Sequence, residues 1–317
     1  MLSSTNAIKI MPNWLLNKGV GYGIFWALLM NSVSALNDVL AKFLGQDLHF
    51  VEVAFFRFFF STLTVFVALI WRYQRSRLHQ KAPSNICKIF QTKYHGEHAI
   101  RGAMGAIAIG LCCFSVNKLP LADNSTILFA DTLFMLPLSA IFLKEQIGIR
   151  CWLATIAGMV GITIMYRPTA DHLNLYAIVP TVAALLFAIM NIMIKKMIEK
   201  QEDHLKMLFY FGLYTTILSS LFVPFYWSIP NQKDLYLLLA LGIGSNLIQF
   251  FLFMAYRATR ASVISTIRYS ELPIEIILGY AFFAQIPDSN GIIGAMIIIA
   301  TTYMMSHREK SPDNSLS

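Results

Sequence analysis

Residues 120–147 read PLADNSTILFADTLFMLPLSAIFLKEQI, an apolar stretch with Asp131 near its middle. Residues 258–286, which read ATRASVISTIRYSELPIEIILGYAFFAQI, resemble that stretch along its length. Each copy is long enough to cross a bilayer once as a helix, for which about 20 apolar residues are needed. The resemblance therefore indicates an internal repeat.

The repeat extends in both directions from these stretches. Upstream, ALNDVLAKFL (35–44) resembles AIMNIMIKKM (188–197), so that Asp38 aligns with Asn191. Downstream, each copy is followed by a helix with a Gly-x-x-Gly pattern, Gly158/Gly161 and Gly291/Gly294. Because three blocks match in the same order, the chain is predicted to consist of two similar halves.

The composition excludes a soluble protein. Of the 317 residues, 56% are hydrophobic and 13% are charged, with a mean hydropathy of +0.58, whereas soluble domains contain about 25% charged residues. Most of the chain must therefore face lipid or other buried helices. The four cysteines show neither metal-ligand spacing nor a disulfide framework: Cys87, Cys112, Cys113 and Cys151.

Apolar stretches of membrane-crossing length recur through the whole chain. Backbone groups in lipid must be satisfied internally, so each stretch is predicted to be a helix. The first is too long for the core of a signal peptide, about 7–15 residues, and is expected to remain as a span. The ten stretches cover residues 19–43, 50–71, 99–118, 121–143, 149–166, 173–194, 205–227, 235–256, 261–284 and 288–306.

The basic residues of the loops indicate the orientation. If the N-terminus is cytoplasmic, the loops on that side hold most of the Lys and Arg residues, including the cluster from Arg72 to Arg101. The opposite loops hold Lys118, Arg167 and Lys233. This asymmetry is the positive-inside pattern. Both termini are therefore predicted to be cytoplasmic, and the net charge of +8 requires no nucleic-acid partner.

An odd number of spans in each half inverts the second half relative to the first, as in many secondary transporters. The sequence thus predicts an all-α integral membrane protein, with ten transmembrane helices in two inverted five-helix repeats. In such folds, binding sites lie near the membrane midplane between the halves. The predicted parts are a cytoplasmic N-terminus (1–18), a first repeat (19–168), a second repeat (169–307) and a cytoplasmic tail (308–317).

Several motifs resemble those of a known family. The ten spans, with the A-D-N-S-T…E-Q-I block of residues 122–147 and its later copy, resemble the drug/metabolite transporter superfamily, EamA type. More narrowly, NDVLAKFLG (37–45), EVAFFRFFFS (52–61) and RYSELPIEIILGYAFF (268–283) resemble the S-adenosylmethionine uptake transporters of intracellular bacteria. The resemblance covers nearly the whole chain and implies a transporter rather than an enzyme.

Charged residues within spans are costly and usually mark a pathway or a binding site. Asp38 and Arg57 are predicted to lie at similar depth, each about two helical turns below the outer surface, which makes them candidate partners. Two other interpretations remain open: Arg57 reaches the outer headgroups, or Asp38 pairs with Lys42 on its own helix. The charged residues within spans are Asp38, Lys42, Arg57, Asp131, Arg268, Glu271 and Glu275.

The ninth span carries the strongest signal. Arg268, Glu271 and Glu275 are three and four residues apart, so they share one face of a helix. Tyr269 lies beside that face, and Pro273 is expected to remove a backbone hydrogen bond in mid-helix. The alternative to a binding role is an internal salt bridge from Arg268 to Glu271. Glu275 then lacks a counterion unless it is protonated, which leaves a proton-carrying role open for Glu275 or Asp131.

Uncharged polar groups also lie at depth in the predicted spans. Asn191, Asn246 and Gln249 are equally compatible with a binding role and with hydrogen bonding between helices. Phe56 lies next to Arg57 and is a candidate to stack on an aromatic ligand. The sequence shows no metal site, no cofactor motif and no set of catalytic residues.

The family resemblance implies S-adenosylmethionine as the substrate, moved across the bacterial inner membrane by alternating access, with exchange for S-adenosylhomocysteine as one option. Arg57 or Arg268 is expected to bind the carboxylate. Glu271, Asp38 or Asp131 is expected to bind the ammonium and sulfonium, and Tyr269 and Phe56 are expected to stack on the adenine or face the sulfonium. The candidate residues are Asp38, Phe56, Arg57, Asp131, Asn191, Asn246, Arg268, Tyr269, Glu271 and Glu275. The alternatives are an exporter of amino acids or related metabolites, and a non-transporting scaffold or intramembrane enzyme. Membrane lipid is an expected partner, and a homodimer is an open option.

Overall fold

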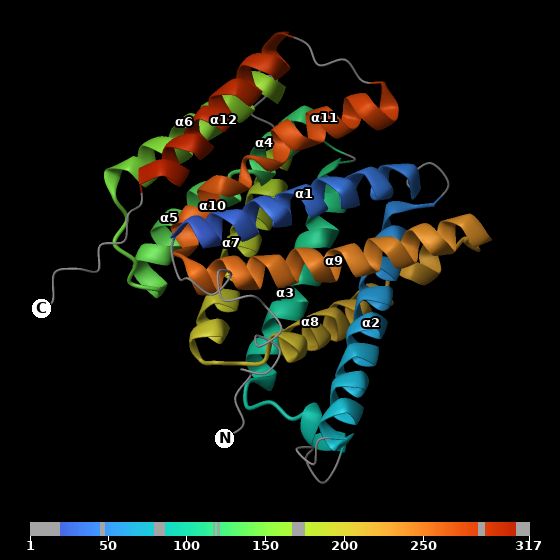
Figure 1. The fold of residues 1–317 in the computed structure, drawn as a ribbon. Helices are drawn as coiled ribbons and strands as arrows, with labels where there is room; N and C mark the ends of the chain where they lie inside the picture. Colours follow the sequence, from blue (N-terminus) through green and yellow to red (C-terminus); the bar gives the residue numbers. More distant parts are fainter. Residues whose placement is uncertain are drawn as a thin grey trace, which may run out of the picture.

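The computed structural model describes residues 20–44, 48–78, 86–116, 118, 121–166, 175–284 and 289–308. These residues form helices joined by short turns, with no β-strand in the part of the chain so described. Figure 1 shows the helices gathered into one body. The segments predicted as the cytoplasmic N-terminus and as the tail beyond Arg308 lie outside the described residues. The prediction of an all-α membrane protein is confirmed.

The two repeats have the same order of helices. The first consists of α1 (Val20–Leu44), α2 (Phe50–Leu78), α3 (His95–Val116), α4 (Leu121–Leu128), α5 (Asp131–Phe142) and α6 (Ile149–Tyr166). The second consists of α7 (Ile178–Glu199), α8 (His204–Ser219), α9 (Gln232–Ala258), α10 (Ala261–Arg268), α11 (Glu271–Phe283) and α12 (Ser289–Arg308). By length and apolar composition, α1, α2, α7 and α9 each suffice to cross a membrane.

Packing between the repeats follows an approximate two-fold relation. The first helix of the first repeat, α1, packs against α9 of the second repeat. Its equivalent in the second repeat, α7, packs against α3 of the first repeat. Likewise α1 packs against α11, and α7 packs against α5. The axis passes between α2 and α8, which pack on each other, and between α6 and α12, which lie together at one end of the molecule in Figure 1. The repeats are therefore interlocked rather than separate bundles.

The contact between α6 and α12 is made at the second glycine of each Gly-x-x-Gly pattern, Gly161 and Gly294. A Cβ atom added to Gly294 would lie 2.5 Å from the Gly161 carbonyl oxygen and 2.9 Å from the Met165 Cβ atom. Glycine at these positions lets the two helix backbones approach closely, as small residues do at membrane-helix interfaces. The last helices of the two repeats thus pack through the same motif.

Two predicted spans are interrupted. The helix expected over 121–143 breaks at Phe129-Ala130 into α4 and α5, and the helix expected over 261–284 breaks at Tyr269-Ser270 into α10 and α11. At each break an amide bonds to the carbonyl three residues earlier instead of four. The Ala130 amide donates to the Ile127 carbonyl at 3.0 Å, and the Ser270 amide donates to the Ile267 carbonyl at 2.9 Å. Hydropathy is continuous across both breaks, so it does not reveal them. Asp131 and Glu271 begin the second half-helices, where the helix dipole favours an acidic residue.

Side chains from other helices bind the backbone near these breaks. The Asn31 amide of α1 donates to the Ile267 carbonyl at 3.0 Å and to the Ser270 hydroxyl at 2.8 Å. From the other repeat, the Thr132 hydroxyl donates to the Ser265 carbonyl at 3.3 Å. Such partners make non-helical backbone tolerable at membrane depth, because buried polar groups must be satisfied inside the protein.

Other element boundaries also differ from the prediction. The α8 helix ends at Ser219 rather than near residue 227, and a short 3₁₀ turn at Val223–Phe225 follows, since Pro224 has no amide hydrogen to donate. The α3 helix begins at His95 rather than near residue 99, so Arg101, which was counted at the end of the basic cluster, lies well inside the helix. Pro273 occupies the first turn of α11, where it breaks no helical hydrogen bond.

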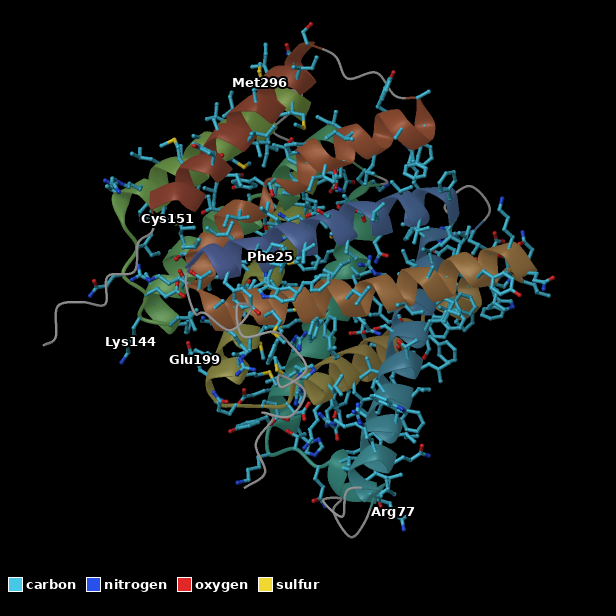
Figure 2. The ribbon with its side chains drawn as sticks, in the orientation of Figure 1. Phe25, Arg77, Lys144, Cys151, Glu199 and Met296 are labelled. Atoms are coloured by element: carbon cyan, nitrogen blue, oxygen red, sulfur yellow. The ribbon has the colours of Figure 1, made fainter. Side chains whose placement is uncertain are left out.

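The exterior of the molecule is apolar along the helices. Phe25 of α1 is 45% exposed and Met296 of α12 is 57% exposed. Figure 2 shows Arg77, Lys144 and Glu199 at or just beyond helix ends, where charged groups reach water. Apolar outer faces with charged ends are what a lipid environment requires.

Candidate functional site

A cavity of about 580 Å³ lies between the two repeats. Its lining comes from both halves, with side chains from the interrupted helices, from α1 to α3 and from α7 to α9. Eight of the ten candidate residues line it: Asp38, Arg57, Asp131, Asn191, Asn246, Arg268, Glu271 and Glu275. The packing of the repeats therefore brings together residues that are far apart in the sequence.

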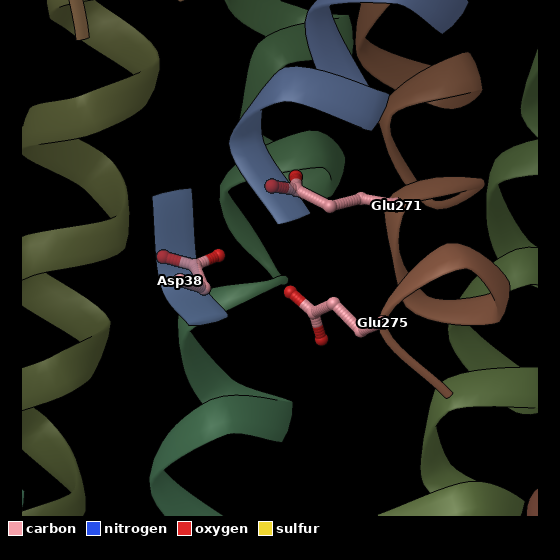
Figure 3. Close-up of side chains that lie close together, drawn as sticks. All are labelled: Asp38, Glu271 and Glu275. Carbon is pink, nitrogen blue, oxygen red and sulfur yellow. The ribbon is translucent and has the colours of Figure 1, made fainter. Parts of the chain in front are cut away.

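Three carboxylates form a cluster on one wall of the cavity (Figure 3). Asp38 comes from α1, and Glu271 and Glu275 come from successive turns of α11, with one oxygen of each within 4.8 Å of the others. Glu271 is 6% exposed, whereas Asp38 is open to the cavity. Such a cluster attracts a cation. Carboxylate oxygens suit metals such as Ca²⁺, but Ca²⁺ takes about 6–8 oxygen ligands, and an organic cation is an equally good match for these groups.

Arg57 faces the cavity from α2. Its Nε–H donates to the Ser245 hydroxyl of α9 at 2.6 Å, and the Asn37 amide donates to the same hydroxyl at 3.1 Å. The charges that act on the guanidinium are those of Asp38 and Glu271. These contacts hold Arg57 at the cavity wall next to the acidic cluster, and not extended toward the membrane surface.

Arg268 and Asp131 form an ion pair between the interrupted helices. Arg268 is the last residue of α10, and its guanidinium donates to the Asp131 carboxylate at the start of α5. Asp131 is 3% exposed, and Thr132 also donates to it at 3.3 Å. The internal pair of Arg268 with Glu271 that the spacing suggested is thus replaced by a pair that joins the two repeats.

The uncharged candidates have different surroundings. Asn246 lines the cavity and also joins α9 to α2: its amide donates to the Thr64 hydroxyl at 2.7 Å, and its carbonyl accepts from the Ser61 hydroxyl at 2.6 Å. Tyr269 is fully buried against Gly158 and is not among the residues that line the cavity. Phe56 packs near Trp227, with ring centroids 5.8 Å apart, and is likewise outside the lining.

Several lining residues were not predicted from the sequence, and Arg101 is the most unusual of them. It is 2% exposed, although its position after a basic loop suggested a solvated side chain. The signal that identifies it is the small-residue run that follows, GAMGAIAIG (102–110), because a tightly packed helix must continue back through Arg101. Phe211 and Tyr256 also line the cavity and add aromatic surface to its charged walls.

Both the sequence and the fold are similar to those of known proteins. The model of the EamA-like transporter family matches twice, over residues 21–167 and 175–307. An S-adenosylmethionine uptake transporter of Rickettsia conorii is 34% identical over 292 residues, covering 92% of this chain and 95% of the relative. A riboflavin transporter of Vibrio cholerae is 28% identical over 221 residues, covering 69% of this chain and 74% of the relative.

A solved crystal structure shares the fold, with a TM-score of 0.71, 15% sequence identity, and coverage of 92% of this chain and 99% of the other. The two matches of the family model coincide with the two packed repeats, and the named relatives are transporters rather than enzymes. The chain is therefore a multi-pass membrane protein that belongs to the EamA-like transporter family.

Proposed function

We propose that this protein is a secondary transporter of S-adenosylmethionine. The observation that carries the proposal is the charge pattern of the cavity, where three carboxylates within 4.8 Å of one another share one chamber with Arg57. S-adenosylmethionine is a zwitterion with an additional sulfonium cation and an adenine ring. Acids bind the ammonium and the sulfonium, and aromatic walls suit the adenine.

The identity of 34% to an S-adenosylmethionine uptake transporter supports the same substrate. In this proposal Asp38, Glu271 and Glu275 bind the cationic groups, while the Asp131–Arg268 pair and the asparagines Asn191 and Asn246 shape the cavity between the repeats. Arg57 balances the acidic cluster when substrate is absent. When substrate binds, its ammonium and sulfonium charges take over part of this balancing of the acids from Arg57.

We propose alternating access as the mode of transport. The two inverted repeats alternately open the cavity to either side of the bacterial inner membrane, with both termini in the cytoplasm. Exchange for S-adenosylhomocysteine, which lacks the sulfonium charge, lets the acidic cluster release one ligand as it accepts another. The direction proposed for S-adenosylmethionine is uptake.

The test is uptake of radiolabelled S-adenosylmethionine into bacterial cells and into liposomes that contain the purified protein. The wild type is expected to accumulate label, and excess S-adenosylhomocysteine is expected to compete and to drive counterflow from preloaded liposomes. Glu271→Gln removes a charge of the cluster and is expected to abolish uptake. The matched control is Glu97→Gln, the same change at a half-exposed glutamate paired with Lys200 at 2.5 Å, away from the cavity lining.

A flavin is the second candidate substrate, because a riboflavin transporter is 28% identical to this chain. Riboflavin is aromatic but carries no cation, so an acidic cluster gives it no advantage. Unlabelled riboflavin in the same assay separates the two possibilities. Competition by riboflavin, with no accumulation of S-adenosylmethionine, would contradict the proposed substrate, and efflux of preloaded label without uptake would contradict the direction.

A further inference from the structure

We infer that Arg101 binds the carboxylate of the transported molecule, on a wall of the cavity separate from the acidic cluster. The inference rests on the proposed function and specifies how the substrate lies in the cavity. Arg101 belongs to α3, whereas the cluster belongs to α1 and α11, so the two sites meet the ligand from different helices.

Arg101 is a buried cation without an acidic partner among the described residues. Its Nη1 donates to the Met207 carbonyl of α8 at 3.3 Å, and its Nη2 donates to the Gln249 carbonyl oxygen of α9 at 3.2 Å. Both acceptors are neutral. The nearby Glu202 lies 3.5 Å from His98 Nε2 and forms no ion pair with Arg101.

One donor of Arg101 has no partner among the described residues. Its Nε–H is buried and has no hydrogen-bond partner, although Arg101 is only 2% exposed. Burial of a charge without compensation is costly, and such groups within membranes mark functional sites. Arg101 lines the cavity, and its two bonded nitrogens donate only to neutral acceptors. A guanidinium with an unpaired N–H at such a position suits a planar oxyanion, which arginine binds with a fork of parallel hydrogen bonds.

The surrounding residues hold the guanidinium in place. Its central carbon lies 4.4 Å from the centroid of the Phe211 ring, a cation–π contact. A Cβ atom at Gly105 would come within 2.8 Å of that ring, so the glycine of α3 is what allows α8 to bring Phe211 to this position. The small-residue run after Arg101 therefore supports the placement of its side chain.

The other two cavity arginines are already compensated. Arg268 is paired with Asp131, and Arg57 lies beside Asp38 and Glu271. A carboxylate that approached either of them would compete with an acid of the protein. Arg101 offers the same chemistry without that competition, so the carboxylate binds at Arg101 while the ammonium and sulfonium face the acids.

Two ligands that differ only in the carboxylate test this orientation. S-adenosylmethionine and its decarboxylated analogue share the sulfonium, the amine and the adenosine, and their affinities for the purified protein are measured by isothermal titration calorimetry. The wild type is expected to prefer S-adenosylmethionine by about 10–100-fold, as for a charged hydrogen bond. Arg101→Gln is expected to remove this preference and to leave the affinity for the decarboxylated analogue within about two-fold.

The matched control is Arg57→Gln, which removes an arginine from the same cavity and is expected to keep the preference. Arg101→Lys keeps a cation but loses the fork of hydrogen-bond donors, and it is expected to show an intermediate preference for S-adenosylmethionine. This variant provides the test if Arg101→Gln does not fold. Equal losses for both ligands in the Arg101 variants would overturn the inference while leaving the proposed function intact. Failure of the wild type to bind either ligand overturns both.

Discussion

Arg268 at the end of α10 forms an ion pair with Asp131 at the start of α5, so one contact joins the interrupted helices of the two repeats. Both residues line the cavity, and each lies next to the point where its helix loses regular hydrogen bonding. Rearrangement at either break must therefore move the other.

The first prediction concerns the ion pair itself. Arg268→Gln leaves Asp131, which is 3% exposed, without its counterion, whereas Asp131→Asn leaves an arginine that is 34% exposed to the cavity. Arg268→Gln is therefore expected to lower the thermal unfolding temperature in detergent more than Asp131→Asn. The double variant is expected to recover about 0.5–3 kcal/mol relative to the sum of the single changes. Additive effects would show that the pair is not coupled.

The second prediction separates stability from transport in the acidic cluster. Asp38, Glu271 and Glu275 place three carboxyl groups with one oxygen of each within 4.8 Å of the others, so burial and mutual repulsion oppose the ionisation of all three and disfavour folding. Glu275→Gln is expected to raise the unfolding temperature and to lower uptake of S-adenosylmethionine, a pattern common at functional sites. Differential scanning fluorimetry and uptake by the same preparation measure both quantities. A variant that loses both stability and uptake would argue for a structural role.

The third prediction tests the contact between α6 and α12. Gly294→Ala places a methyl group 2.5 Å from the Gly161 carbonyl oxygen, so the helices must separate, at an expected cost of about 1–3 kcal/mol. Gly110→Ala in α3 is the control, because a Cβ atom there meets nothing within 4 Å. That substitution is expected to be neutral or stabilising, since alanine favours a helix over glycine. Denaturant unfolding in detergent compares the two.

The fourth prediction concerns pH and the turn between α7 and α8. Burial favours the neutral form of Asp203, but Arg72, His204 and two hydrogen bonds outweigh it, so the pKa of Asp203 lies below its ordinary value. Asp203 accepts from the Leu205 amide at 2.9 Å as the N-cap of α8 and from Arg72 at 2.6 Å. Its contribution to stability is thus present above the pKa that it has when unfolded, about 3.9, and is lost as the pH falls through the lower folded value.

Asp203→Asn keeps the cap, since asparagine is an equally good N-cap residue, and removes the charge. It is expected to cost little at pH 7, because Arg72 is 39% exposed and the pair is screened by solvent. The variant is also expected to lose less stability than the wild type between pH 5 and about pH 3. Thermal unfolding across this range measures the difference, and parallel pH profiles would contradict the role of the Asp203 charge.

The spans themselves are predictable because lipid imposes a minimum apolar length. The helix expected over 149–166 coincides with α6, and the first span differs from α1 by one residue at each end. Charged residues within spans were equally visible, since they stand out against an apolar background. Their pairing was not, because Asp131 and Arg268 are 137 residues apart and meet only through the packing of the repeats.

The helix interruptions and the burial of Arg101 could not be predicted from the sequence, for different reasons. The breaks at Phe129-Ala130 and Tyr269-Ser270 contain neither glycine nor proline. Near the second break, Asn31 of α1 and Thr132 of α5 bind carbonyls of α10, and these contacts form only when the repeats pack. Arg101 follows a basic loop, and hydropathy alone gives no means to tell the last solvated residue from the first buried one. The α3 helix extends toward the N-terminus as far as His95 and packs on α7 and α8.

The approximate two-fold relation between the repeats has an electrical consequence. Counted from the start of each second half-helix, Glu275 of α11 corresponds to Met135 of α5, and Asp38 of α1 corresponds to Asn191 of α7. A scaffold with matching halves gives two access states that mirror each other, but its carboxylates are concentrated on one side of that symmetry. The electrostatic field inside the cavity is therefore lopsided, although the helices that enclose it are duplicated.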